Sequence, residues 1–133
     1  MEAEKRVKEG RVELECNISD FGLSEIDSPW KLLTYLKENQ PAEDIVLTHG
    51  DYCLPNIFAE GDQISGFIDL GRMGPADRWQ DIALAIRSLR DNFSGKYSNE
   101  KMIFDFQPEM LLSELDMELD EEKLRYYLLL DML

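Results

Sequence analysis

Histidine and cysteine are scarce in this 133-residue chain. It has one histidine, His49, and two cysteines, Cys16 and Cys53, with no Cys-x-x-Cys pair. A disulfide scaffold, a zinc ribbon and a histidine-rich metal cluster are therefore disfavoured. No apolar run approaches the roughly 18 residues of a membrane span, and the charged start MEAEKRVKEG lacks the apolar core of a secretory signal. We therefore expect a cytoplasmic protein with reduced cysteines and no membrane partner.

Positive charge is also scarce. The chain has 14 Lys and Arg against 28 Asp and Glu, so 14 − 28 gives a net charge of −14. This balance disfavours binding to a nucleic-acid backbone, which needs a basic face. With 44% hydrophobic residues the chain is too apolar for a disordered acidic tail, and its length allows one domain. The negative charge indicates either solubility alone or a cationic partner.

Local signals predict an α+β fold that is mostly helical. Ser28-Pro29 is typical of a helix start, Asp77 with Gln80 resembles a capping box, and Asp120 precedes the last helical stretch. We expect helices over 29–37, 77–90 and from 121, weaker helical character over 3–14 and around Pro108, and short strands over 45–47, 57–59 and 64–68.

One segment contains the residues whose spacing indicates a chemical function. Residues 49–56, His-Gly-Asp-Tyr-Cys-Leu-Pro-Asn, have the spacing His-x-Asp-x₄-Asn, and Asp69-Leu70-Gly71 follows. This order is typical of kinase-type phosphoryl transfer, in which Asp51 would handle the hydroxyl proton and Asn56 and Asp69 would hold Mg²⁺. Mg²⁺ prefers hard oxygen ligands, and an acceptor hydroxyl needs a carboxylate within hydrogen-bonding reach. We expect His49 to organise the loop through hydrogen bonds rather than to shuttle protons.

The two expected strands that follow this loop would form a small β-hairpin carrying the metal ligands. If they pair about a turn at Asp62-Gln63, residues whose numbers sum to 125 lie opposite each other. Asn56 and Asp69 would then emerge side by side. A shift of one residue in this strand pairing would turn one of the two metal ligands away from the other.

Each piece has a plainer interpretation when it is taken alone. A single Asp in a loop is usually a turn residue, and an Asp-x-Gly triplet arises by chance in many proteins. The joint order of loop, hairpin and second Asp favours the kinase interpretation. A Ser-His-Asp hydrolase is disfavoured because the chain has no Gly-x-Ser-x-Gly motif.

Two stretches, THGDYCLPNIF and SGFIDLGRMGPADRWQDIALAIRSLRDNF, closely resemble aminoglycoside 3′-phosphotransferases, the kanamycin and neomycin kinases of antibiotic resistance. The ending KLRYYLLLDML resembles the last helix of that family, whereas 94–119 match it poorly. The resemblance implies a protein-kinase-like fold, of which residues 1–133 would be the C-terminal lobe. It also implies transfer of the ATP γ-phosphate to a sugar hydroxyl of an aminoglycoside.

The resemblance also implies roles for individual residues. Asp51 would be the catalytic base, Arg72 would help to set the loop and the metal-binding strand, and Asn56 and Asp69 would bind magnesium with ATP. Asp81 would tether the backbone of the catalytic loop. The acidic antibiotic site of the family maps onto Asn17, Asp20, Asp91, Asp131 and the end of the chain at Leu133. The family tends to have Glu at positions 17 and 132 and an aromatic residue after 133, so these contacts depart from its pattern.

The Gly-rich phosphate loop and the strand lysine of kinases do not occur in these 133 residues. We therefore expect a truncated or split enzyme that is inactive alone, with a separate N-terminal lobe as a candidate partner. Two alternatives stay open: a non-catalytic acidic remnant that binds a cationic ligand, and a kinase for another small alcohol such as choline or a hexose. The Gly71-Arg72 continuation argues against the second alternative.

Overall fold

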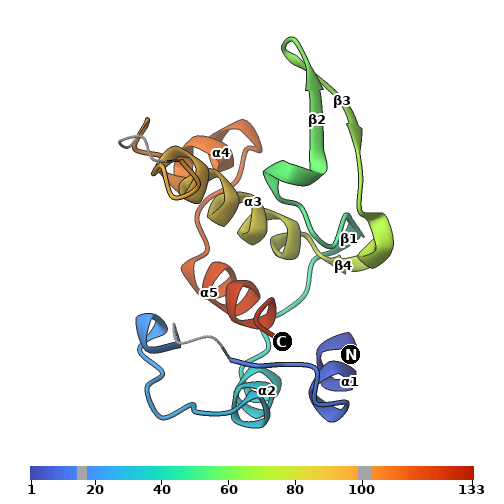
Figure 1. The fold of residues 1–133 in the computed structure, drawn as a ribbon, viewed down its shortest axis with the longest axis vertical. Coiled ribbons are helices and arrows are strands. Elements are labelled where there is room, and N and C mark those ends of the chain that lie inside the picture. Colours follow the sequence, from blue (N-terminus) through green and yellow to red (C-terminus); the bar gives the residue numbers. More distant parts are fainter. Residues whose placement is uncertain (15–17, 99–102) are drawn as a thin grey trace. The chain divides into compact units, whose positions relative to one another are not determined.

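The computed structural model describes residues 1–14, 18–98 and 103–133, which form two compact units (Figure 1). Unit 1 comprises residues 1–42 and 125–133, and unit 2 comprises residues 43–124. Within the described ranges, no helix combines the length and the apolar character required to cross a membrane.

Unit 1 is helical. Its elements are α1 (Glu2–Lys8), the 3₁₀ helix η1 (Ile18–Phe21), α2 (Pro29–Glu38) and the end of α5 (Glu121–Leu130). The predicted start of α2 is confirmed, because the Ser28 hydroxyl accepts a hydrogen bond of 3.3 Å from the Lys31 amide. The weak helical pattern over 3–14 yields only the short α1, and Gly10 follows it with a φ of 65°. Arg125 on α5 donates to the Phe21 carbonyl at 2.6 Å.

Unit 2 combines two small sheets with helices. Its elements are β1 (Ile45–Thr48), η2 (Leu54–Asn56), β2 (Ile57–Glu60), β3 (Gln63–Phe67), η3 (Leu70–Arg72), β4 (Gly74–Asp77), α3 (Arg78–Phe93), α4 (Pro108–Glu114) and the start of α5. Both sheets are two-stranded and antiparallel, β1 with β4 and β2 with β3. Residues 49–53 connect β1 to η2, and Ile68 and Asp69 connect β3 to η3.

Strand β4 was not predicted. Its sequence, Gly-Pro-Ala-Asp, lacks the β-branched residues that mark most strands. It pairs with β1 from Ile45 opposite Asp77 to Thr48 opposite Gly74, and the Thr48 hydroxyl adds a 2.9 Å bond to the Gly74 carbonyl. The pairing places the start of α3 beside the start of β1.

Helix α3 begins where the sequence predicts and ends three residues beyond Arg90. Its cap differs from the expected capping box, because Asp77 Oδ1 accepts from the Trp79 amide at 2.8 Å and Gln80 takes no part in this bond. The other oxygen of Asp77 accepts from the Asp44 amide and from Lys123 Nζ, both at 2.7 Å. One cap residue thereby joins β1, α3 and the start of α5.

The predicted register of the β2–β3 hairpin is wrong. Ile57 lies opposite Phe67, and the Ile68 amide donates to the Asn56 carbonyl at 3.0 Å, so Asn56 faces Ile68 and not Asp69. The turn is Gly61-Asp62, and a bulge between Phe58 and Ala59 leaves Ser65 as the extra residue of β3. The two expected metal ligands flank the hairpin instead of forming a matched pair on it.

Candidate active site

The loop over residues 49–56 is held at its start by a carboxylate on α3. Asp81 Oδ2 accepts from the His49 amide at 2.7 Å, and Asp81 Oδ1 accepts from the Gly50 amide at 2.9 Å. These are contacts of the kind that the resemblance implied for Asp81. Charge-assisted bonds to two successive amides fix the path of the chain just before Asp51.

The far end of the loop is held by Ser88, which sequence reasoning missed. Its hydroxyl accepts from the Leu54 amide at 2.9 Å, and the residue is 8% exposed. Ser88 lies seven residues after Asp81, two helical turns along the same face of α3. The available signal was a small polar residue at that spacing on an otherwise apolar face.

His49 organises the loop through both ring nitrogens. Its Nδ1 lies 3.2 Å from the Asp51 amide and its Nε2 lies 2.9 Å from the Ile68 carbonyl. An amide can only donate and a carbonyl can only accept, so this geometry selects the neutral ring protonated at Nε2. The ring also packs edge-on against Tyr52 and Phe67, at centroid distances of 5.9 and 6.1 Å.

Gly50 brings the loop against the Arg72 segment. Its φ is +89°, and a Cβ at this position would stand 2.3 Å from the Arg72 carbonyl oxygen. Only glycine fits both the backbone angle and the space. The loop over residues 49–56 and the Asp69–Arg72 turn are therefore in close contact, although Arg72 itself is exposed.

Asp51, Cys53 and Asn56 form one cluster of side chains. Asn56 Nδ2 donates to Asp51 Oδ2 at 3.1 Å and to the Asp51 carbonyl at 2.9 Å. The Cys53 thiol lies 3.7 Å from Asp51 Oδ1, and its pKa is raised by burial and by the Asp51 charge. With its nitrogen committed to Asp51, the side-chain oxygen of Asn56 is the atom that it offers to a cation.

Asp69 follows the hairpin in an unusual backbone conformation. Its φ of 60° and ψ of 52° lie in the left-handed region, which a short polar side chain tolerates better than most. The residue is exposed. The described residues contain no group of three or more His, Cys, Asp or Glu side chains placed to hold a metal ion. The expected ligands Asn56 and Asp69 have one amide oxygen and one carboxylate in their side chains.

The residues expected to contact an antibiotic are divided between the units. Asp91 lies on α3 in unit 2 and accepts from Lys96 Nζ at 2.9 Å. In unit 1, Asp20 is exposed on η1, Asp131 is half-buried after α5, and Leu133 is buried with 1% exposure. Asn17 lies outside the described residues. These positions stay predictions.

Comparison with known proteins gives a consistent result. Residues 10–127 match the model of a phosphotransferase enzyme family. An aminoglycoside 3′-phosphotransferase of Niallia circulans is 50% identical over 105 residues, covering 78% of this chain and 37% of that protein. The crystal structure of an aminoglycoside 3′-phosphotransferase of type VIII matches with a TM-score of 0.71 and 32% identity, over 98% of this chain and 48% of that one.

A second solved structure holds ligands. The aminoglycoside phosphotransferase from Streptomyces rimosus, in complex with ADP and streptomycin, matches with a TM-score of 0.67 and 31% identity, over 98% of this chain and 49% of that one. The chain thus spans less than half the length of the relatives that it matches.

Proposed function

This chain belongs to the phosphotransferase enzyme family, and from that premise we propose that it forms part of an ATP-dependent kinase acting on a hydroxyl of aminoglycosides. The observation that carries the proposal is the loop clamped by Asp81 and Ser88, in which Asn56 holds the carboxylate of Asp51. The relatives named above as aminoglycoside phosphotransferases support the substrate class.

In this proposal Asp51 accepts the proton of the acceptor hydroxyl or aligns it for in-line attack. The bond from Asn56 Nδ2 to Asp51 Oδ2 orients the carboxylate, and the bond from the Asp51 amide to His49 Nδ1 fixes the backbone that bears it. His49 acts by position, because both ring nitrogens are already engaged in the loop. His49 and Asn56 therefore contribute by positioning, and Asp51 is the residue that deals with the proton.

The amide oxygen of Asn56 and the carboxylate of Asp69 suit Mg²⁺. This ion commonly takes one or two protein oxygens and fills its other positions with water and substrate phosphates. When bound, Mg²⁺ would neutralise charge on the transferring phosphate. In this proposal the left-handed turn at Asp69 and the close approach of Gly50 to Arg72 would hold Asp69 near the loop.

The negative charge favours a polycationic substrate. The net charge of −14 attracts amine-rich molecules over long distances at low salt, and Asp20, Asp91 and Asp131 are the carboxylates assigned to contact them. The remaining half of such an enzyme would provide the phosphate-covering loop and the strand lysine. Exposed Leu47, Phe58 and Ile64 on the two sheets offer it an apolar surface, at 73%, 50% and 58% exposure.

The first experiment uses the 133-residue chain alone. Isothermal titration with kanamycin is expected to give saturable binding that weakens as salt rises, since the attraction is electrostatic. A parallel isothermal titration of the same chain uses MgATP. Transfer of phosphate to kanamycin by this chain alone would contradict the need for a second lobe. Absence of any kanamycin binding would contradict the substrate class.

The second experiment tests the base in an active enzyme that contains this segment. Asp51→Ala is expected to lower turnover of kanamycin about 10²–10⁴-fold, the range for loss of general-base help. Asp62→Ala, in the exposed Gly61-Asp62 turn, is the matched control and should retain turnover. Full activity of Asp51→Ala would overturn the assignment, and preference for choline or a hexose over kanamycin would overturn the substrate class.

A further inference from the structure

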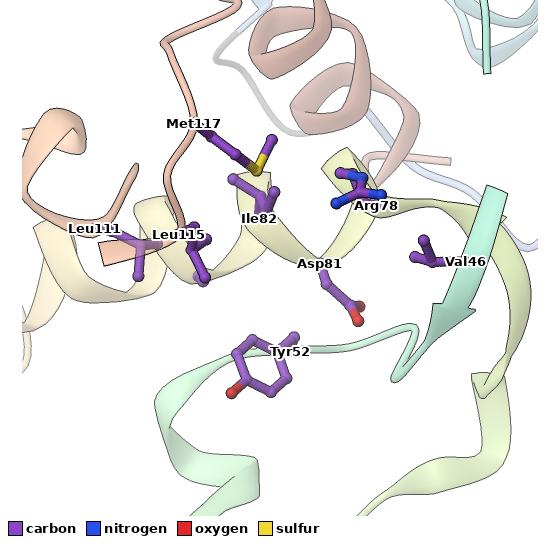
Figure 2. A pocket seen from close by; sticks show the side chains of 9 residues that line it. Val46, Tyr52, Arg78, Asp81, Ile82, Leu111, Leu115 and Met117 are labelled. Carbon is purple, nitrogen blue, oxygen red and sulfur yellow. The ribbon is translucent and has the colours of Figure 1, made fainter. Parts of the chain in front are cut away.

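A separate pocket of about 340 Å³ lies beside the catalytic loop within unit 2 (Figure 2). It is shaped by β1, the loop, α3, and α4 with the stretch that follows. Asp51, Asn56 and Asp69 are not among the residues that line it. Its volume is near the lower end of small-ligand sites, which span roughly 300–1,000 Å³.

The pocket wall is apolar except on one side. Six aliphatic or thioether side chains form most of it: Val46, Ile82, Ala85, Leu111, Leu115 and Met117. The ring of Tyr52 adds an aromatic surface from the catalytic loop (Figure 2). The charged side chains of Arg78 and Asp81, both from the first turn of α3, lie on the side opposite Leu111.

Arg78 is paired with a carboxylate, and the oxygens of Asp81 are hydrogen-bonded to backbone amides. Arg78 Nε lies 2.6 Å from Asp44 Oδ2, and each oxygen of Asp81 accepts one backbone N–H. A ligand therefore needs no net charge. Each carboxylate oxygen retains a lone pair that accepts from one further donor. Burial and the Asp81 charge raise the pKa of Tyr52, so its hydroxyl stays protonated and the side chain neutral.

We propose that this pocket binds an uncharged, ring-sized aromatic molecule that carries one N–H or O–H donor, with the donor directed at Asp81. The ring would lie against the aliphatic wall and Tyr52, where removal of apolar surface from water provides the affinity. The site is distinct from the proposed phosphate-transfer site, and the proposal stands whether or not the chain is a kinase.

Occupation of this pocket also affects the catalytic loop. Asp81 holds the amides of His49 and Gly50, and Tyr52 is itself part of the loop. A ligand that binds only the closed loop slows its opening in proportion to 1 + [L]/Kd. At a ligand concentration ten times its Kd, hydrogen exchange at these two amides should slow about tenfold where exchange requires loop opening.

Indole is the probe that tests the proposal, with indene as the isostere that lacks the N–H. Titration of the full chain, followed by amide chemical shifts, is expected to give saturable changes at Tyr52, Ile82 and Ala85. Indene should bind at least about tenfold more weakly, because a hydrogen bond to a charged acceptor is lost. Equal binding of the two probes, or no saturable binding of indole, would overturn the proposal.

Two tryptophan variants locate the site. Leu115→Trp places a large ring at the pocket rim and should abolish the indole-dependent shifts and the slower exchange. Met110→Trp adds the same ring on α4 itself and should leave both effects intact, because Met110 does not line the pocket. Both positions are 47% exposed, so neither substitution disturbs a packed core. Indole shifts that survive Leu115→Trp would refute the assignment.

Discussion

At the scale of single residues, the loop depends on a glycine that packs tightly against Arg72, against its backbone and its Cβ alike. Gly50→Ala forces a Cβ to within 2.3 Å of the Arg72 carbonyl oxygen at a φ of +89°. We expect a loss of about 2–4 kcal/mol in the free energy of unfolding, from overpacking and left-handed strain together. Urea denaturation measures it.

Gly61→Ala is the control for that strain. Gly61 has a φ of +60°, but nothing lies within 4 Å of the added Cβ. Its cost should be limited to about 1–2 kcal/mol of left-handed strain. Equal costs at positions 50 and 61 would show that the contact with Arg72 contributes nothing.

Ser88 gives a second prediction at this scale. Removal of its hydroxyl in Ser88→Ala leaves the Leu54 amide without its 2.9 Å partner. We expect a loss of about 1–2 kcal/mol and faster hydrogen exchange at Leu54. Ser88→Thr keeps the hydroxyl and should retain slow exchange. The amides of His49 and Gly50, held by Asp81, should be unaffected; a matching acceleration there would argue against two separate clamps.

At the scale of elements, Asp77 connects β1, α3 and α5. Burial acts to raise its pKa, but hydrogen bonds from Lys123 and from the Asp44 and Trp79 amides outweigh burial, so the pKa lies below its ordinary value of 3.8. A carboxylate with a lowered folded-state pKa stabilises the fold above its unfolded pKa, and that stabilisation is lost as pH falls through the folded-state pKa.

Lys123→Met tests this junction. Lys123 and Asp77 are 14% and 0% exposed in their side chains, so loss of one partner leaves a buried charge. We expect a cost of about 3 kcal/mol at pH 7 that shrinks below about pH 4, as Asp77 becomes protonated. Lys96→Met removes an ion pair with Asp91 in which Lys96 is 56% exposed, and should cost less than about 1 kcal/mol. A pH-independent cost for Lys123→Met would contradict the lowered pKa.

The sequence predicts elements best where local signals act alone. Ser28-Pro29 and the Asp120 cap act within one turn, so α2 and α5 start where expected; the Lys123 amide donates to Asp120 at 2.9 Å. Strand β4 was missed because its four residues have little strand preference and depend on β1 as a partner. The hairpin register failed for a similar reason, because a bulge is a property of two paired strands.

The candidate site shows the same difference between local features, which the sequence predicts, and contacts between distant segments, which it does not. The spacing of Asp51 and Asn56 indicated the loop, because both residues act within eight positions of His49. The clamp from Ser88 and the approach of Gly50 to Arg72 join segments far apart in the sequence. Nothing local marks such contacts. The neighbours of a buried hydroxyl or a crowded glycine become known only when the fold is known.

At the scale of the whole molecule, the excess of negative charge decides how the stability of the fold depends on salt. The net charge of −14 is spread over 133 residues, and several ion pairs are exposed, such as Lys31 with Asp27 at 57% and 70%. Exposed pairs contribute little, so repulsion among the remaining carboxylates should outweigh them. The fold should therefore be more stable when salt shortens the range of that repulsion.

Thermal unfolding across a salt series tests this balance. The screening length falls from about 30 Å at 0.01 M to about 8 Å at 0.15 M. We expect NaCl to raise Tm over that range by roughly 2–6 °C, which corresponds to about 1 kcal/mol. Glu114→Lys, on the exposed last turn of α4, should lower the slope of Tm against salt, with Glu114→Gln intermediate. A fall of Tm with salt would mean that attractive ion pairs, led by Lys123 with Asp77, exceed the repulsion.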